Sequence, residues 1–231
     1  RRFRKELADD RKSLLRKFGT RIYRPQRPGE KWVRVTALGS YREVGRAMHL
    51  VTTNESKVLV DCGAKPTNNR SEVQPFFAAP EMLPLDNIDA VVITHAHVDH
   101  IGMLPVLFKY GYKGPVYCTP PTRDLMTLLQ MDYIKVAKAE GNEPPYSKAD
   151  IQECIKHVVD INWGDKTDIA PDVKMTMENA GHILGSSSVY MQIGEGREEH
   201  RLLFSGDIKY EKSWLFDAAT VRFNKVDTLV I

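Results

Sequence analysis

The chain has 231 residues, of which 42% are hydrophobic and 27% charged, and its net charge is +3; this composition predicts a soluble globular chain of one or two domains with a sizeable core. No apolar run approaches the length of a membrane span and the N-terminus has no apolar signal segment, so we expect no membrane association and a cytoplasmic location. The three cysteines, Cys62, Cys118 and Cys154, are odd in number and widely separated, which excludes a disulfide framework and predicts small buried side chains.

The first predicted element is a basic helix over residues 2–18, ending at Gly19 and followed by a linker over 24–29 that contains two prolines. Residues 1–31 hold twelve Lys and Arg against four acidic residues, a net charge of +8, so the remainder carries −5. This asymmetry suggests a polyanionic partner, although a solvated helix with a linker explains it equally well. We divide the chain into a basic helix and linker over 1–31 and a second domain over 32–231.

Three strands are predicted next, over residues 33–38, 48–52 and 57–60, the last running into Asp61-Cys62-Gly63. The loop after the first strand holds Glu43 and Arg46, which either line the entrance of a site or form a salt bridge within the turn. Residues 64–80 contain several prolines and asparagines and are predicted to be loop.

The next strand, over 90–94, leads into the most informative segment of the chain, His95-Ala96-His97-Val98-Asp99-His100, which contains three of the seven histidines. Proteins seldom place so many polar groups at the end of an apolar strand unless they are used. Histidines at i and i+2 can bind one metal ion when the residue between them is as small as Ala96, while Asp99 and His100 point at a second position. Zinc suits such mixed imidazole and carboxylate ligands.

Helices are predicted over 101–110, 123–140 and 148–157, with a short strand over 116–118 after the first. Strands follow over 173–177, 188–193 and 201–204. The final apolar segment, 226–231, is expected to be a buried strand, and the chain is expected to be part of a longer protein.

One hexapeptide cannot complete two coordination spheres, so we expect further ligands at other loop starts. His182 lies between Gly181 and a short apolar segment after one predicted strand, and Asp207 follows Ser205-Gly206 after another. Glycine permits the tight backbone path that brings such side chains to a metal.

These segments resemble the metallo-β-lactamase superfamily, and within it the β-CASP nucleases, most closely the archaeal homologues of the cleavage and polyadenylation specificity factor. Besides the hexapeptide, the resemblance is carried by residues 41–46, 60–63, 114–125, 179–186 and 205–210. It implies an α/β fold, the αββα sandwich of two β-sheets flanked by helices, with metals at one edge. Residues 1–31 resemble the linker that follows the RNA-binding KH domains of that group.

The resemblance also implies a role for each site residue. His95, His97 and His182 would hold a first zinc ion, Asp99 and His100 a second, and Asp207 would bridge the two Zn²⁺ ions. Asp99 and Asp61 are the expected catalytic carboxylates: Asp99 orients the nucleophile and accepts its proton, and Asp61 orients the cluster by hydrogen bonds.

The implied activity is hydrolysis of phosphodiester bonds in single-stranded RNA, as an endonuclease or 5′→3′ exonuclease in RNA 3′-end processing or transcription termination. RNA polymerase and a second copy of the full-length protein are the expected partners. The β-CASP insertion, which carries the general acid, and the last histidine of the second zinc site are missing from this sequence. We therefore expect the first part of the metallo-β-lactamase domain, and weak zinc binding and RNA cleavage by this segment alone.

Three other functions stay open: a small-molecule hydrolase such as a glyoxalase II-like thioesterase, a DNA nuclease, and a non-catalytic subunit. The long helix over 123–140 and the basic segment argue against the thioesterase. The presence of every ligand expected in this span argues against the non-catalytic subunit.

Overall fold

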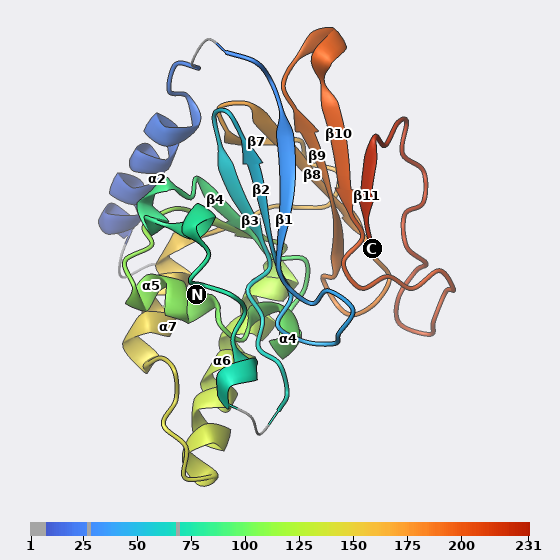
Figure 1. The fold of residues 1–231 in the computed structure, drawn as a ribbon. Helices are drawn as coiled ribbons and strands as arrows, with labels where there is room; N and C mark the ends of the chain where they lie inside the picture. Colours follow the sequence, from blue (N-terminus) through green and yellow to red (C-terminus); the bar gives the residue numbers. More distant parts are fainter. Residues whose placement is uncertain (1–7, 27–28, 68–69) are drawn as a thin grey trace.

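Two mixed β-sheets pack face to face, and a layer of helices covers the outer side of the first sheet (Figure 1). This is the architecture of the computed structural model, which describes residues 8–26, 29–67 and 70–231. The α/β fold class and the sheet-on-sheet sandwich predicted from the sequence are therefore confirmed. None of the helices in these ranges is both long and apolar enough to cross a lipid bilayer.

The first sheet has six strands that follow one another in chain order. The first three strands are antiparallel, and the third to sixth are parallel. Its strands are β1 (Val33–Gly39), β2 (Met48–Thr53), β3 (Lys57–Val60), β4 (Ala90–Val92), β5 (Val116–Cys118) and β6 (Val158–Asp160). The two central parallel strands, β4 and β5, are buried along their whole length because both faces of this sheet are covered.

Helices connect the parallel strands and lie on the outer face of the first sheet. They are α3 (Arg70–Val73), α4 (Val98–Ile101), α5 (Leu104–Lys109), α6 (Pro120–Ala139) and α7 (Lys148–His157), with 3₁₀ turns at Pro80–Met82 and Leu85–Asn87. The Thr119 side chain caps α6, and Ser147 and Asp150 form a reciprocal capping box at the start of α7.

The second sheet has five strands in the order β11-β10-β9-β8-β7. Neighbouring strands are antiparallel except for β10 and β11, which are parallel. The strands are β7 (Thr167–Ala170), β8 (Val173–Asn179), β9 (Ser187–Ile193), β10 (His200–Phe204) and β11 (Thr228–Val230), with a 3₁₀ turn at Gly196–Glu198 before β10.

Alternating side chains of the first sheet supply two separate cores. Val58 and Val60 of β3 face the second sheet and pack with residues such as Met175, whereas Leu59 faces the helices. The same alternation divides β4. Both cores are closely packed, so the strands that carry the polar residues at their ends are held rigidly.

The N-terminal helix α2 (Ala8–Ile22) differs from the sequence prediction at its C-terminal end. The helix continues through Gly19 to Ile22, and its predicted start at residues 2–7 lies outside the described residues. Phe18 on this helix is buried against His157 of α7. This tertiary contact outweighs the small helix penalty of one glycine.

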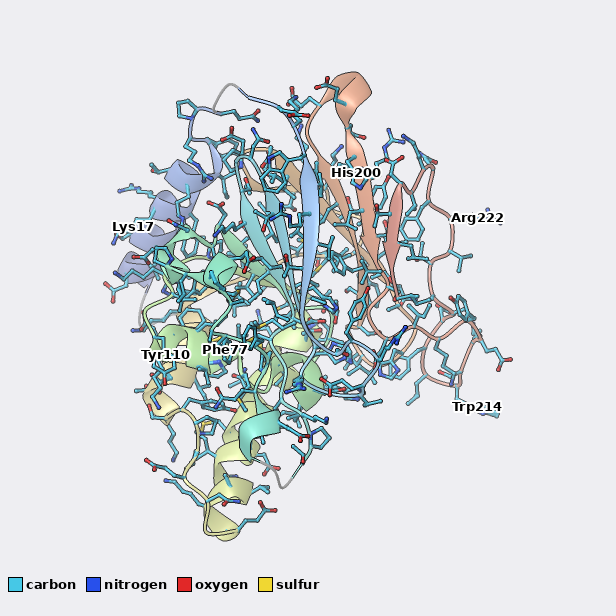
Figure 2. The ribbon with its side chains drawn as sticks, in the orientation of Figure 1. Lys17, Phe77, Tyr110, His200, Trp214 and Arg222 are labelled. Atoms are coloured by element: carbon cyan, nitrogen blue, oxygen red, sulfur yellow. The ribbon has the colours of Figure 1, made fainter. Side chains whose placement is uncertain are left out.

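The basic residues of α2 and the segment after it are divided between two roles. Three arginines are hydrogen-bonded to the rest of the chain: Arg11 to the carbonyls of Lys156 and Val158, Arg21 to those of Asp86 and Ile88, and Arg24 to the carboxylate of Asp89. Others, such as Lys17, point into solvent (Figure 2). Some of the basic residues therefore attach the helix and the segment after it to the rest of the chain.

Two strands were missed and one helix was predicted as a single piece. β6 and β7 are short and lack a distinct apolar alternation, so their register is set by neighbouring strands. The predicted helix over 101–110 is split at Gly102, because the Met103 amide leaves the helix pattern and donates to the Cys62 carbonyl. The three cysteines are buried free thiols, as predicted.

Candidate metal centre

Four strands deliver the polar site residues to one edge of the sandwich. In the first sheet, β3 runs into Asp61 and β4 into the histidine hexapeptide. In the second sheet, β8 and β10 are both antiparallel to β9 and therefore parallel to each other, and they run into His182 and Asp207. Since all four carboxyl ends meet at the same edge, residues more than a hundred positions apart become neighbours.

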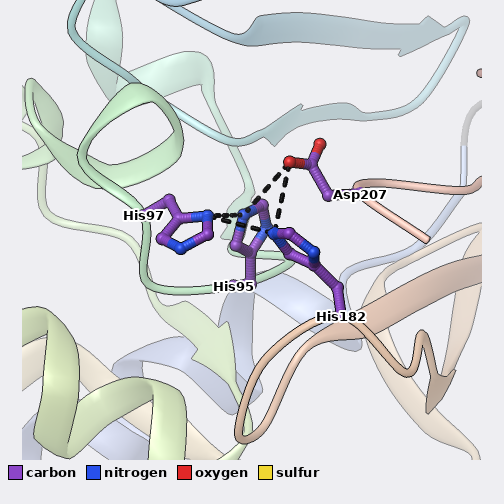
Figure 3. A group of neighbouring side chains, drawn as sticks. All are labelled: His95, His97, His182 and Asp207. Carbon is purple, nitrogen blue, oxygen red and sulfur yellow. Dashed lines mark hydrogen bonds and ion pairs between the residues drawn. The ribbon is translucent and has the colours of Figure 1, made fainter. Parts of the chain in front are cut away.

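Three imidazole nitrogens and one carboxylate oxygen converge in the first group (Figure 3). His97 Nδ1 lies 3.1 Å from His95 Nε2 and 3.1 Å from His182 Nε2. Asp207 Oδ2 lies 3.7 Å from His95 Nε2 and 3.5 Å from His182 Nε2. The ligand atoms of these four residues all lie within 4.8 Å of one another.

A second group adjoins the first through the other oxygen of the same aspartate. Asp207 Oδ1 lies 3.4 Å from His100 Nε2, and Asp99 Oδ2 lies 3.8 Å from that nitrogen. The two oxygens of Asp207 thus face different groups, one formed by His95, His97 and His182 and the other by Asp99 and His100. The structure brings all six residues together.

Asp61 lies beneath both groups and is almost fully buried. Its Oδ1 accepts from the Thr94 backbone N–H at 2.8 Å, and its Oδ2 accepts from the Thr94 hydroxyl at 2.8 Å. His100 Nδ1 lies 2.8 Å from the same Oδ2. An N–H on His100 Nδ1 leaves the lone pair of Nε2 directed at the second group.

Thr94 has a role that the sequence interpretation missed, since it was assigned only to the strand. Its hydroxyl donates to Asp61, so its lone pairs can accept an N–H from His95 Nδ1, which lies 3.1 Å away. That arrangement leaves His95 Nε2 unprotonated and directed at the first group. The available signal was a hydroxyl residue immediately before the first histidine.

Close backbone packing fixes the loops that hold these side chains. A Cβ on Gly63 would lie 1.5 Å from the Asp99 carbonyl oxygen, so only glycine fits where the turn after β3 passes under α4. Gly181 has a φ of +70°, which lets the chain turn sharply before His182. Asp61, although not glycine, has a φ of +59°, a strained conformation typical of functional sites.

Burial and neighbouring charges separate the protonation states of the site. Burial, reinforced by the nearby His100, lowers the pKa of His95 to about 2, and burial also lowers the pKa of His182. Burial opposes a charge on His100, but the Asp61 and Asp207 carboxylates raise its pKa to about 10. The hydrogen bond with His100 holds the pKa of Asp207 well below its usual range.

The donor set fits a divalent cation. Neutral imidazoles and ionised carboxylates are the forms that bind metals. The lowered pKa values of His95 and His182 favour the neutral form, whereas His100 must release a proton when it binds a metal. Four ligands around tetrahedral zinc lie about 3.3 Å apart, given zinc–nitrogen distances near 2.0–2.1 Å; the separations in the first group run from 3.1 to 3.7 Å between the neighbouring atoms given above. A single shared proton cannot satisfy three converging nitrogens, whereas a cation can.

A cavity of about 470 Å³ opens beside the second group. One part of its wall is formed by Asp61, His100 and Asp207, and another by Tyr41 and Arg42 of the loop after β1. Glu43 and Arg46 of the same loop form an ion pair of 2.5 Å. Of the two roles considered for them, the turn salt bridge is the one observed.

Comparison with known protein families is consistent with this geometry. The profile of the metallo-beta-lactamase superfamily matches residues 42–228. A metallo-beta-lactamase from Cronobacter sakazakii has a similar fold, with a TM-score of 0.50 at 17% sequence identity over 77% of this chain and 64% of that one. At that identity the likeness concerns the fold alone.

Two archaeal relatives carry the name transcription termination factor FttA. The protein from Methanosarcina mazei is 49% identical over 230 residues, which cover 100% of this chain and 36% of the relative. The protein from Methanocaldococcus jannaschii is 49% identical over 221 residues, which cover 95% of this chain and 34% of the relative. The chain thus spans about a third of the length of these curated relatives.

Proposed function

The chain belongs to the metallo-beta-lactamase superfamily, and we propose that it is a zinc-dependent ribonuclease that hydrolyses phosphodiester bonds of single-stranded RNA. The observation that carries the proposal is the pair of ligand groups joined by Asp207, whose two oxygens face different groups of side chains. Two-metal centres of this kind are used for in-line displacement at phosphorus.

We propose that each of the two groups of side chains would bind one metal ion. His95, His97 and His182 would hold one zinc ion, and Asp99 and His100 the other, with Asp207 shared between them. When bound, the zinc ions would supply a nucleophile from water near neutral pH and neutralise charge on the phosphoryl oxygens.

The protein's own residues position the ligands and handle the proton. Asp61 and Thr94 contact Nδ1 of His100 and of His95, so that Nε2 of each ring is directed at one of the two groups. The Asp99 side chain is 28% exposed and its Oδ2 lies 3.8 Å from His100 Nε2, so its carboxylate can orient a water molecule at the second group and accept its proton. His95 is fully buried, which keeps water away from the inner side of the first group.

The biological setting is proposed from the relatives. The names of the archaeal homologues support action in transcription termination or RNA 3′-end processing, as an endonuclease or a 5′→3′ exonuclease. That setting would bring the protein to nascent single-stranded RNA and to RNA polymerase in the cytoplasm. We further propose that the full-length protein acts as a homodimer.

Replacement of Asp99 by Ala tests this function in the full-length protein. We expect zinc-dependent cleavage of a labelled single-stranded RNA to fall by at least about a hundredfold, because both a metal ligand and a proton acceptor are lost. Asp132→Ala, at an exposed position on α6, is the matched control and should cleave normally. Undiminished cleavage by the Asp99→Ala protein would favour a non-catalytic role.

A further inference from the structure

The loop between β1 and β2 forms part of the wall of the cavity that adjoins the second ligand group. Ser40, Tyr41 and Arg42 line this cavity together with His100 and Asp207. The same loop meets the histidine segment directly, because the Ala47 amide donates to the Asp99 carbonyl oxygen at 2.8 Å. A residue on this loop is therefore placed to contact whatever is bound at the metal centre.

The loop is held in an unusual backbone conformation. Ser40, Arg42 and Arg46 have φ values of +64°, +57° and +49°, a region that residues other than glycine seldom occupy. Such strain persists only where surrounding contacts enforce it. Its position beside the candidate centre agrees with the tendency of strained residues to gather at functional sites.

The contacts that enforce the conformation come from the second half of the loop. Glu43 accepts hydrogen bonds from Arg46 Nε at 2.5 Å and from Lys65 Nζ at 2.8 Å. The Arg46 guanidinium also donates to the backbone carbonyls of Glu72 and Gln74. These bonds fix the loop to the segment around α3, so the first half projects from a rigid base.

Arg42 differs from Arg46 in that it has no part in this scaffold. Within the described ranges, its guanidinium forms no hydrogen bond or ion pair, and the residue is exposed. Tyr41, beside it on the cavity wall, is 72% exposed. An arginine held on a strained loop at the mouth of a site, with its fork-shaped donors unused, is suited to an anionic ligand.

We propose that Tyr41 and Arg42 bind the substrate strand next to the cleaved bond: the Arg42 guanidinium pairs with a neighbouring phosphate, and the Tyr41 ring stacks on a base. This inference rests on the proposed ribonuclease function and adds the residues that recognise a nucleic-acid chain. The shared chemistry is a single-stranded phosphodiester backbone, which both RNA and DNA present.

The two side chains should leave different signatures in binding. Loss of a cation that contacts phosphate lowers affinity and also reduces the salt dependence of binding, by about 0.7 in the slope of log K against log salt for a single strand. Loss of a stacking ring lowers affinity without changing that slope, because no counterion is released.

The test uses the full-length protein with a chelator present, so that no cleavage occurs, and a fluorescein-labelled oligouridylate followed by anisotropy at several salt concentrations. We expect Arg42→Gln to bind roughly tenfold more weakly with the smaller slope, and Arg42→Lys to retain the wild-type slope. Tyr41→Leu should bind more weakly with an unchanged slope. Arg222→Gln, at an exposed position outside this cavity lining, should match wild type (Figure 2).

Kinetics of the zinc-loaded protein provide the second readout. A contact beside the scissile bond contributes equally to the ground and transition states, so Arg42→Gln should raise KM for RNA roughly tenfold and leave kcat unchanged. Hydrolysis of bis(p-nitrophenyl) phosphate, which has no neighbouring phosphate, should not change. The same binding measurement with a DNA oligonucleotide of matching sequence shows whether Arg42 contacts the phosphates of RNA alone or of both RNA and DNA.

The outcomes separate this inference from the function on which it rests. If wild type cleaves RNA but Arg42→Gln equals wild type in slope, affinity and KM, the role of Arg42 is wrong and the ribonuclease proposal stands. A wild-type slope for Tyr41→Leu with undiminished affinity would overturn the stacking contact. If wild type neither binds nor cleaves RNA, the ribonuclease proposal fails and this inference fails with it.

Discussion

Asp61 connects the two ligand groups at the scale of single residues. Its carboxylate accepts hydrogen bonds from the backbone N–H and the hydroxyl of Thr94, and it contacts Nδ1 of His100. Its own backbone is strained, with a φ of +59°. One buried carboxylate thus orients the ring of His100 directly and that of His95 through Thr94.

Thr94→Val tests this relay, because valine keeps the shape of the side chain and removes the hydroxyl. Without it Asp61 loses one donor and His95 Nδ1 loses its acceptor, so we expect zinc affinity to fall roughly 10- to 100-fold. Affinity is measured by zinc titration of the metal-free full-length protein against a competing chelator.

The conservative variant separates the hydroxyl from packing. Thr94→Ser keeps the hydroxyl but removes the methyl group, so its zinc affinity should stay close to wild type. The relay would be refuted if the valine and serine variants bound zinc equally well.

Sequence reasoning at this scale found the candidate ligands but not their support. His182 and Asp207 were predicted to approach the hexapeptide because each follows its own strand, and the structure brings them within 3.1 Å of His97 and 3.4 Å of His100 respectively. Thr94 and Arg42 were not identified, since their importance depends on side-chain direction across distant loops.

At the scale of elements, α2 and the segment after it are attached to the two-sheet domain by arginines rather than by a large apolar face. Arg24 forms a two-pronged contact with Asp89, with distances of 2.6 and 3.2 Å. The Asp89 side chain is only 6% exposed, and it also accepts from the Lys57 backbone N–H. A buried carboxylate that loses such a partner is costly.

Arg24→Ala should therefore lower the free energy of unfolding by about 2 kcal/mol, since a buried carboxylate keeps only its weaker partners. Chemical denaturation of the full-length protein measures the change. Arg16→Ala is the matched control on the exposed face of α2, where only a small effect is expected. Equal effects of the two substitutions would show that the Arg24 contact does not stabilise the fold.

The elements most readily predicted were those with a strong pattern of their own. The sequences of β2 and β3 show alternating or continuous apolar residues, and α7 has both a capping residue and apolar residues at helical spacing. α6 begins at Pro120, before its predicted start, because Thr119 caps it and proline suits the first helical position. β6 and β7 lack such signals and are defined by pairing with distant strands.

At the scale of the whole molecule, the sandwich aligns the ends of four strands from two sheets. The apolar layer between the sheets fixes their relative position, so Asp61 and the hexapeptide from one sheet meet His182 and Asp207 from the other. The sequence resemblance predicted this meeting, because periodicity alone identifies strands but not which sheet edges coincide. Asp207, which has one oxygen toward each group, is the residue on which the proposed two-metal centre depends.

The zinc content of the full-length protein, measured by mass spectrometry alongside cleavage of single-stranded RNA, tests the account most directly. We predict two zinc ions per chain in wild type. In Asp207→Ala, we expect the zinc content to fall and RNA cleavage to be lost. Asp217→Ala, at an exposed ion pair with Lys212, should keep the zinc content and the cleavage activity of wild type. A single zinc ion per chain, or RNA cleavage undiminished by Asp207→Ala, would contradict a two-metal ribonuclease centre joined by this residue.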